Sequence, residues 1–552
     1  MSPQRRDAIV ALALSLLLAV ALTWPMAARL GSAGRVDSGD GRHGVWNVSW
    51  VAHALTTSPT RLFDANIFYP HDNALAFSEA NLVAGVLAVP AWVITGGNPY
   101  AAYNSVVLMA FAMAALAAYF LARTVGAGRF GATIAAIVYG YSPYMLAHIP
   151  HIQLLMTFGP ALSLAMMHRF VTTPTTGRAV ALGLTLSVTG LACAYYGIFS
   201  GLVVGIGILW FAGMDGHWRQ WQYWARSVLA GLIVLVVILP FFLPYLSVRE
   251  AGFARSLDEA RLFSTIGRAY LASAVHVHAW MLPLLGSWRE VLFPGFQAIV
   301  LAVVAIVITA RHRTHPRVRI VGYYVVMMVF AFWVSLGPDA GLYTLLYHAI
   351  PAFSFLRAPA RMGVMVTLGV ALLSSLALTW WRPTRVGNRR LATAVIVLMA
   401  VVESWAGPLQ LQTATPINKV YRHLAILPRA PVAEFPFYQG ADERHRQTEY
   451  MLMSTFHWQP LLNGYSDHFP DDYMTAKPVL TTFPSQEAVA LLQERGVRWV
   501  VVHFNRYPVD YARQLRPLMR TMAKQLRVVI DDTEVGLYEV IFPMRPAALR
   551  LP

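Results

Sequence analysis

Long blocks of consecutive apolar residues dominate the pattern along this chain of 552 residues. The blocks at 8–28, 226–246 and 361–380 each approach the roughly 20 residues that a helix needs to cross a hydrocarbon core of about 30 Å. Similar blocks recur up to residue 406 and predict about eleven spanning helices. The predicted spans are 8–28, 102–121, 131–147, 152–170, 179–194, 196–213, 226–246, 294–310, 320–336, 361–380 and 391–406. The pattern therefore indicates a polytopic α-helical membrane protein.

One further apolar segment, 80–95, is short, carries Pro90 and runs into Gly96-Gly97-Asn98-Pro99. If it does not cross the membrane, the short loops that carry clusters of arginine fall on the cytoplasmic side, as the positive-inside rule requires. These arginines are Arg123, Arg129, Arg169, Arg178, Arg219, Arg226, Arg311, Arg313, Arg317, Arg319, Arg382, Arg385, Arg389 and Arg390. We therefore expect 80–95 to be a re-entrant or juxtamembrane helix on the outer face, with the N-terminus in the cytoplasm.

The remaining outer segments are few and long, and they comprise 29–101, 247–293, 337–360 and everything after about 407. The 247–293 segment alternates charged and apolar residues, which predicts either an amphipathic helix in the interface or a solvated helix covering the bundle. From 407 the composition becomes that of a soluble α/β domain. Its predicted strands are 431–437, 497–504, 526–531 and 536–541, and its predicted helix is 485–495 with Ser485 as N-cap. The expected domains are thus a transmembrane domain over 1–406 and an extracytoplasmic domain over 407–552.

Composition agrees with this division, because 57% of the residues are hydrophobic and only 13% are charged, whereas a soluble domain is about one quarter charged. The net charge of +16 comes from arginines at helix ends and forms no basic stripe with interleaved aromatics. We therefore expect contact with membrane lipids and not with nucleic acid. The single cysteine, Cys193, excludes an internal disulfide and a cysteine-based zinc site. The 8–28 run is longer than the ~7–15 residue core of a cleaved signal peptide, so we expect a retained helix.

Candidate chemistry is concentrated in the first outer loop, where four carboxylates are the candidates: Asp37, Asp40, Asp64 and Glu79. A carboxylate just outside the first span can act as general base for a hydroxyl acceptor, and Asp40 is the first choice. Alternatively, Asp40 has only a structural role in a turn, because Asp-Gly is a common turn dipeptide. Candidate substrate contacts in the same loop are Asn47, Tyr69 and His71. No phosphate-binding loop, dinucleotide fingerprint, HExxH or GxSxG motif occurs, which argues against an ATP-driven pump.

Two basic patches are expected on the same outer face. Arg357 and Arg361 lie four residues apart at a helix start, where bidentate guanidinium contacts would clamp a phosphate. Alternatively, the two arginine side chains snorkel to the membrane interface or contact lipid headgroups and bind no substrate phosphate. His148 and His151 link two spans and are either substrate contacts or interfacial anchors.

The arrangement resembles the GT-C class of glycosyltransferases: one N-in helix, a long outer loop with an early aspartate, many further spans and an outer C-terminal domain. The stretches 64–71, 78–79, 98–104, 141–144, 356–361 and 454–466 resemble a group of bacterial membrane proteins that are regarded as GT-C-like. The last stretch contains Trp458 and Tyr465, which become further candidate substrate contacts. The resemblance spans nearly the whole chain.

The resemblance implies that a sugar moves from a polyprenyl-phosphate carrier to an envelope glycan, lipid or protein acceptor, at the outer face of the bacterial inner membrane and with inversion. Asp40 then becomes the base, with Asp37, Asp64 and Glu79 as rivals, while Arg357 and Arg361 hold the carrier phosphate. It implies neither a metal nor a cofactor. Two alternatives remain: a transporter or flippase for a lipid-linked glycan, and a non-catalytic relative that binds glycan. The near absence of Asp, Glu and Lys from the spans argues against transport.

Overall fold

The computed structural model describes residues 3–37, 39–250, 255–286, 290–312, 314–380 and 386–543. Packing divides the chain into two compact units. Unit 1 comprises Met1–Arg35, Asn81–Ala88 and Tyr103–Gln412, and unit 2 comprises Val36–Ala80, Val89–Ala102 and Thr413–Pro552. Most of the predicted first outer loop, 29–101, thus packs with the C-terminal segment. The domain boundary near residue 406 was predicted from the change in composition along the sequence. It stays a prediction.

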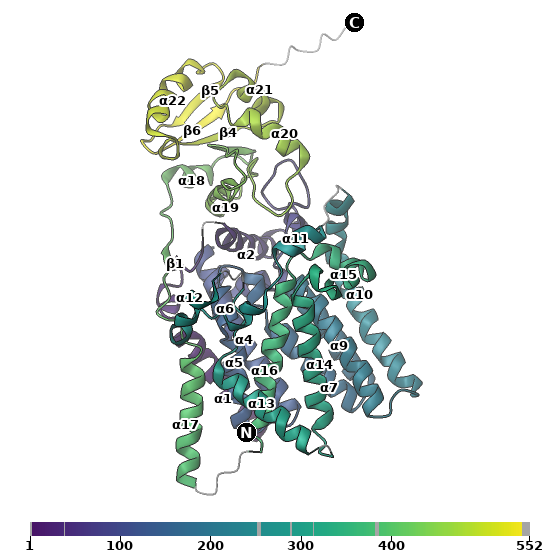
Figure 1. Cartoon of the computed structure of the whole chain (residues 1–552). Helices are drawn as coiled ribbons and strands as arrows, with labels where there is room; N and C mark the ends of the chain where they lie inside the picture. Colours follow the sequence, from purple (N-terminus) through teal and green to yellow (C-terminus); the bar gives the residue numbers. More distant parts are fainter. Residues whose placement is uncertain are drawn as a thin grey trace. The chain divides into compact units, whose positions relative to one another are not determined.

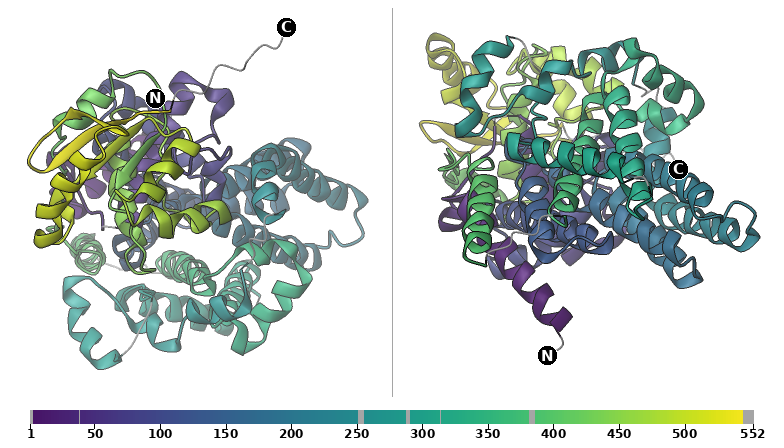
Figure 2. Two further views of the ribbon diagram at one scale, coloured as in Figure 1. Left: turned by 90° about the horizontal axis from the view of Figure 1, so that it is seen from above. Right: turned by 60° about the horizontal axis from the view of Figure 1, so that its bottom comes forward.

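Unit 1 is helical (Figures 1 and 2). Its helices are α1 (Pro3–Leu22), α4 (Pro99–Thr124), α5 (Arg129–Gly140), α6 (Pro143–Ala147), α7 (Phe158–Thr172), α8 (Thr176–Ala192), α9 (Ala194–Met214), α10 (Trp221–Glu250), α11 (Leu257–Leu262), α12 (Leu282–Leu285), α13 (Phe296–Arg311), α14 (Val318–Ser335), α15 (Leu342–Ala349), α16 (Gly363–Ala377) and α17 (Val386–Val402). Helix α3 (Leu82–Ile94) begins in unit 1 and ends in unit 2.

Six helical stretches among the described residues are long and apolar enough to span a membrane: Pro99–Thr124, Ile152–Thr172, Ala194–Met214, Trp221–Val248, Val318–Ser335 and Pro359–Ala377. Four shorter apolar helices accompany them: Leu82–Ile94, Thr176–Ala192, Phe296–Arg311 and Arg390–Val402. The chain is therefore a multi-pass membrane protein. The predicted number of about eleven spans, the sidedness and the re-entrant placement of 80–95 stay predictions. Arg313, Arg382 and Arg385, which support the predicted sidedness, lie outside the described residues.

Small residues allow the helices of unit 1 to approach closely. Helix α8 packs against α7, α9 and α10, while α16 packs against α5, α13 and α14. A Cβ atom added at Gly131 of α5 would lie 2.4 Å from the carbonyl oxygen of Ser375 in α16. One added at Gly140 would lie 2.5 Å from Ala115 of α4. Such small-residue contacts are typical of helix packing in membranes, where van der Waals contact replaces the hydrophobic effect.

Beyond α10, the described part of the 247–293 segment is divided into several short elements and is not one continuous helix, either interfacial or covering the bundle. It forms α11, two 3₁₀ turns, η5 (Gly267–Leu271) and η6 (His276–Met281), and α12. Ser256 caps α11 by accepting a hydrogen bond from the backbone N–H of Glu259. Some of its charges form ion pairs: Arg255 lies 2.8 Å from Glu259 within the segment, and Arg261 lies 2.8 Å from Asp339, 78 positions along the chain. Ion pairs thus account for several of the charged residues that alternate with apolar ones.

Unit 2 contains α2 (Asp40–Thr57) and a four-stranded mixed sheet with its helices (Figure 1). The strands are β3 (Val432–Phe435), β4 (Trp499–His503), β5 (Leu526–Ile530) and β6 (Val535–Val540), and the helices are α18 (Lys419–Leu424), α19 (Gln447–Ser454), α20 (Asp471–Leu480), α21 (Gln486–Glu494) and α22 (Val509–Thr521). The order is β3-β4-β6-β5, with β3 parallel to β4 and the other pairs antiparallel. All four predicted strands, and the helix capped by Ser485, are confirmed within two residues. Two short strands, β1 (Ala33–Gly34) and β2 (Gln412–Thr413), lie where the chain passes between the units.

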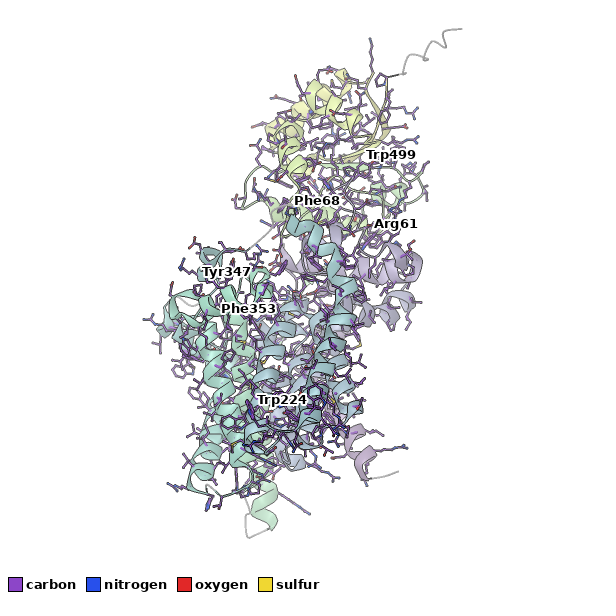
Figure 3. The ribbon with its side chains drawn as sticks, turned by 90° about the vertical axis from the view of Figure 1, so that its right-hand side faces the viewer. Arg61, Phe68, Trp224, Tyr347, Phe353 and Trp499 are labelled. Atoms are coloured by element: carbon purple, nitrogen blue, oxygen red, sulfur yellow. The ribbon has the colours of Figure 1, made fainter. Side chains whose placement is uncertain are left out.

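Buried side chains tie the first outer loop to the C-terminal segment within unit 2. The Asn66 amide donates to the Ser454 hydroxyl at 3.0 Å and accepts from the Trp46 indole at 3.2 Å. Phe68, labelled in Figure 3, packs edge-on against Phe469 and Tyr473 with ring centroids 5.7 and 5.0 Å apart. These contacts make the loop part of the hydrophobic core of unit 2.

Candidate functional site

Asp37 supports the turn that starts α2. Its Oδ1 accepts hydrogen bonds from the backbone N–H groups of Gly39 at 3.0 Å and Gly41 at 2.8 Å. A Cβ added at Gly41 would lie 2.9 Å from the Cα of Val36, so the tight turn needs glycine there. The Asp37 carboxylate thus has a structural task in this turn.

Asp40 is the first residue of α2, and the helix brings a histidine to the same face one turn later. Residues three apart on a helix are neighbours on its surface, which places His43 beside Asp40. The Tyr465 hydroxyl donates to Asp40 Oδ1 at 3.3 Å, and its ring lies 6.0 Å edge-on from His43. The structure therefore brings together the predicted residues Asp40 and Tyr465. Sequence reasoning missed His43, although the Asp40–His43 spacing is a readable signal once α2 is known to be helical.

The electrostatic surroundings favour the neutral form of His43. Burial lowers the pKa of the imidazole below its ordinary value, and the nearby carboxylates of Asp40 and Asp467 oppose that effect without cancelling it. Burial disfavours the charged form of a histidine, whereas a carboxylate favours it. At neutral pH the imidazole therefore carries no charge but has two carboxylates near enough to stabilise an added proton.

An ion-pair network fixes the first turn of α2 against α19. Arg42 Nη1 lies 3.1 Å from Glu449 Oε2, and Arg506 binds the other carboxylate oxygen of Glu449. The Arg506 guanidinium also stacks over the Tyr450 ring, 5.0 Å from its centroid. These partly buried pairs immobilise the turn that carries Asp40 and His43.

The other predicted residues of the first loop mainly hold the loop together. Asp64 accepts hydrogen bonds from the Arg61 side chain and from the Asn73 backbone N–H, each at 3.2 Å. His71 Nε2 lies 2.7 Å from Asp472 Oδ1. The Asn47 amide donates to the Glu79 carbonyl at 3.2 Å, and the Tyr69 backbone N–H donates to the Leu461 carbonyl at 2.8 Å. Their catalytic or substrate-binding roles stay predictions.

Trp458 belongs to an aromatic cluster in unit 2. Its indole stacks on His53 with ring centroids 4.3 Å apart and an interplanar angle of 12°. Trp50 and Trp92 lie edge-on to it, at 5.6 and 6.1 Å. Trp458 also has a positive φ of 52°, which is rare for a bulky side chain and costs conformational energy. Burial, assisted by Arg429, lowers the pKa of His53 to about 4, so the stacked imidazole is neutral at physiological pH.

In unit 1 the two predicted clamp arginines meet at one tyrosine. The Arg361 guanidinium stacks over the Tyr195 ring, 4.4 Å from its centroid. The Arg357 backbone N–H donates to the Tyr195 hydroxyl at 2.9 Å. The segment before them is anchored, because the Tyr343 hydroxyl donates to the Leu356 carbonyl at 2.9 Å. Nearby Tyr347 donates to the Arg255 carbonyl at 2.7 Å (Figure 3).

A carboxylate that sequence reasoning missed joins the predicted histidines. Glu290, whose side chain is 14% exposed, lies 3.2 Å from His148 Nε2. His148 Nδ1 contacts the Tyr144 carbonyl at 2.8 Å, and the His148 and His151 rings lie 5.9 Å apart. Burial raises the pKa of Glu290, but His148, Arg361 and His151 outweigh it and keep the pKa below its ordinary value. We call Arg361, His148, His151 and Glu290 the basic cluster of unit 1.

Within the described ranges, no group of three or more His, Cys, Asp or Glu side chains converges as metal ligands would. The basic cluster offers guanidinium and imidazole donors, which suit an anionic oxygen. The expectation of a reaction without a metal or a cofactor stays a prediction.

No protein-family model matches the chain. Comparison with curated proteins also finds no match. Among solved structures, the arabinofuranosyltransferase AftD from Mycobacteria has a TM-score of 0.58 at 15% identity over 98% of this chain, which spans 40% of the length of AftD.

Two further structures agree in fold. ArnT from Cupriavidus metallidurans, bound to undecaprenyl phosphate, has a TM-score of 0.50 at 15% identity over 99% of both chains. The oligosaccharyltransferase of Archaeoglobus fulgidus, tethered with an acceptor peptide, has a TM-score of 0.52 at 12% identity over 98% of this chain and 74% of its own. The chain therefore has a GT-C-like fold.

Proposed function

We propose that the protein is an inverting glycosyltransferase that moves a sugar from a polyprenyl-phosphate carrier to a hydroxyl of an envelope glycan, lipid or protein acceptor, at the outer face of the bacterial inner membrane. The observation that carries the proposal is the basic cluster of unit 1, where Arg361, His148 and His151 surround the single carboxylate of Glu290. The GT-C-like fold supports it, because ArnT of the same fold holds undecaprenyl phosphate.

On the donor side, the guanidinium groups of Arg357 and Arg361 hold the phosphate of the carrier. Arginine suits this task because its planar fork donates two parallel hydrogen bonds to one phosphate. The bond between the anomeric carbon and the phosphate oxygen breaks, and the phosphate leaves with the electron pair. A cationic cluster stabilises the additional negative charge on the departing lipid phosphate.

On the acceptor side, Asp40 activates the attacking hydroxyl group. Its position at the start of α2, where the Arg42–Glu449 pair fixes the turn, gives it a defined orientation. The acceptor oxygen attacks the anomeric carbon from the face opposite the phosphate, so a single displacement inverts the configuration. Asp37, Asp64 and Glu79 remain rivals for this role, and Asp37 is the least favoured because its oxygen already serves two backbone donors.

Release of free polyprenyl phosphate tests the proposal directly. Purified protein in detergent receives undecaprenyl-phosphate-linked mannose, galactose and arabinofuranose as donors and octyl glycosides as acceptors. An enzyme releases undecaprenyl phosphate and forms a new glycoside of inverted anomeric configuration. Binding of donor without any release would instead favour a transporter or a non-catalytic glycan-binding protein.

A further inference from the structure

Two buried polar atoms have no hydrogen-bond partner among the described residues: Nε2 of His43, one turn from Asp40, and Oγ of Ser466, which follows Tyr465 in the sequence. Ser466 is only 7% exposed. Buried polar atoms in folded proteins are almost always paired, and the exceptions call for a specific explanation. The unpartnered Nε2 of His43, close to the Asp40 carboxylate, indicates a place where a polar ligand completes the hydrogen bonds.

The segments that carry these two atoms both contact the surroundings of Asp40. His43 follows Asp40 by one turn of α2, and Ser466 follows Tyr465, whose hydroxyl donates to Asp40. Tyr465 also packs edge-on against the His43 ring. Two elements therefore meet at Asp40: the first turn of α2 supplies a carboxylate and an imidazole, and the 465–467 segment supplies the Tyr465 hydroxyl and the nearby Asp467 carboxylate.

The charged groups that face His43 are Asp40 on its own helix and Asp467 on the neighbouring segment, and both favour its protonated form. Arg42 of the same turn is paired with Glu449 and so adds little positive charge. Burial nevertheless keeps the pKa of His43 below its ordinary value. A neutral imidazole with carboxylates nearby is the arrangement that general-base histidines use, because the carboxylate stabilises the imidazolium that forms.

We propose that His43 is the group that receives the proton of the acceptor hydroxyl, through Nε2, while Asp40 and Asp467 stabilise the resulting imidazolium. Ser466, whose buried hydroxyl is unpartnered on the neighbouring segment, binds a second hydroxyl of the acceptor, so the proposed acceptor class is a polyhydroxylated glycan. The inference rests on the proposed glycosyltransferase function and deepens it. It assigns Asp40 the task of binding the hydroxyl and stabilising charge.

The proposed step balances. The acceptor O–H bond breaks as its oxygen bonds to the anomeric carbon, and the proton moves to Nε2 of a His43 tautomer protonated at Nδ1. The bond from the anomeric carbon to the phosphate oxygen breaks, and the electron pair leaves with the lipid phosphate. The imidazolium then returns its proton to water when the product departs.

The acid limb of the kcat/KM profile reports the titration of the base, and its loss in His43→Gln assigns that titration to the imidazole. A histidine base loses activity as the pH falls through its pKa, and burial places the pKa of His43 below its ordinary value, so the limb lies towards the acid end of the profile. The assay follows release of undecaprenyl phosphate with octyl glycoside acceptors between pH 4 and 8. We expect the wild-type protein to lose tenfold per pH unit at the acid end of this range.

Substitution of His43 supplies the second measurement. His43→Gln should lower kcat by about 10²–10⁴-fold and remove the acid limb, with little change in donor binding. His43→Ala should recover activity when imidazole is added, which a merely structural role would not produce. Ser466→Ala should raise KM for the glycoside acceptor more than it lowers kcat. His423→Asn, on helix α18 of the same unit, is the matched control and should leave the profile unchanged.

The outcomes separate the inference from the function on which it rests. Turnover that is lost in Asp40→Asn but kept within threefold in a folded His43→Gln protein would overturn the role of His43 alone. An acid limb that persists in His43→Gln, or failure of imidazole to rescue His43→Ala, would do the same. If the wild-type protein releases no undecaprenyl phosphate from any of the three donors, the proposed function is overturned and the inference falls with it.

Discussion

At the scale of single residues, neighbouring carboxylates differ in what their oxygens already bind. Asp37 serves two backbone N–H groups and Asp64 bridges Arg61 and Asn73, so both stabilise loop structure. Asp40 instead accepts from a tyrosine hydroxyl beside a neutral histidine. Position in the sequence singled out Asp40, and the hydrogen bonds now supply a physical reason to rank it above Asp37.

Asp40→Asn should therefore abolish most turnover, by about 10²–10⁴-fold, because an amide cannot take or stabilise the proton. Asp37→Asn should do much less, because the amide oxygen still accepts from Gly39 and Gly41. The measurement is release of undecaprenyl phosphate, with monodispersity in detergent as the folding control.

Two results would change this assignment. Full turnover in Asp40→Asn together with loss in Asp64→Asn or Glu79→Gln would move the carboxylate role to another residue of the loop. If none of the four carboxylates affects turnover, the glycosyltransferase proposal should give way to transport or glycan binding.

The clamp arginines give a second prediction at this scale. Arg357→Ala or Arg361→Ala should weaken binding of undecaprenyl phosphate by about 1.5–3 kcal/mol, the typical contribution of a hydrogen bond to a charged group. Lysine at either position should recover only part of the affinity, because it lacks the planar fork. Titration calorimetry or a thermal-shift series measures the difference, with Arg498→Ala in unit 2 as the control.

If the doubly substituted protein binds undecaprenyl phosphate with unchanged affinity, both arginines have a structural or lipid-facing role and do not form the clamp. Arg361 also stacks on Tyr195, so each variant needs a melting temperature beside its affinity. A loss of affinity that merely follows a loss of folding would also count against the clamp.

At the scale of elements, the strands could be predicted because β3 and β4 are buried on both faces and their residues are mostly apolar, with Glu434 as the one charged residue in β3. Helix α2 was not predicted, since its stretch was treated as loop, although Val45, Val48 and Val51 recur at near-helical spacing. The pairing of Arg42 with Glu449 joins residues 407 positions apart. No local pattern encodes such a contact, and so the surroundings of Asp40 and the role of Glu290 had to come from the structure.

Buried histidines predict how the elements of unit 2 respond to acid. His457 accepts a hydrogen bond at Nδ1 from the Gln459 backbone N–H at 3.0 Å, and burial lowers its pKa to about 3. Below about pH 6.5 the imidazole of His457 is protonated in the unfolded chain but stays neutral in the folded protein. Stability should therefore fall as the pH drops from 6.5 towards 3, by up to about 1.4 kcal/mol per pH unit for this histidine.

His457→Asn keeps an acceptor for the Gln459 N–H and removes the titration, so its stability should depend less steeply on pH than that of the wild-type protein. Thermal unfolding in detergent between pH 7 and 4 measures both. Equal slopes for the two proteins would show that His457 is solvated or protonated in the folded state.

At the scale of the whole molecule, the GT-C-like fold coexists with only 12–15% identity to AftD, ArnT and the oligosaccharyltransferase. Such divergence is expected where apolar pattern and small-residue contacts specify helix packing, because many sequences satisfy both. Function resides in particular side chains. For that reason the donor sugar and the acceptor must be determined by experiment on this chain.

The last prediction concerns sidedness, which follows from the distribution of arginines. If 80–95 does not cross, the loops rich in arginine lie in the cytoplasm and the short connection at 148–151 carries none. A reporter fused after residue 410 should then be active only on the extracytoplasmic side, and one inserted within 383–390 only in the cytoplasm. Enzymatic reporters that require one compartment, assayed in intact cells, measure both positions. The reverse pattern would mean that 80–95 spans the membrane, and it would put both the segment after 407 and the basic cluster of unit 1 on the side where no lipid-linked sugar is proposed.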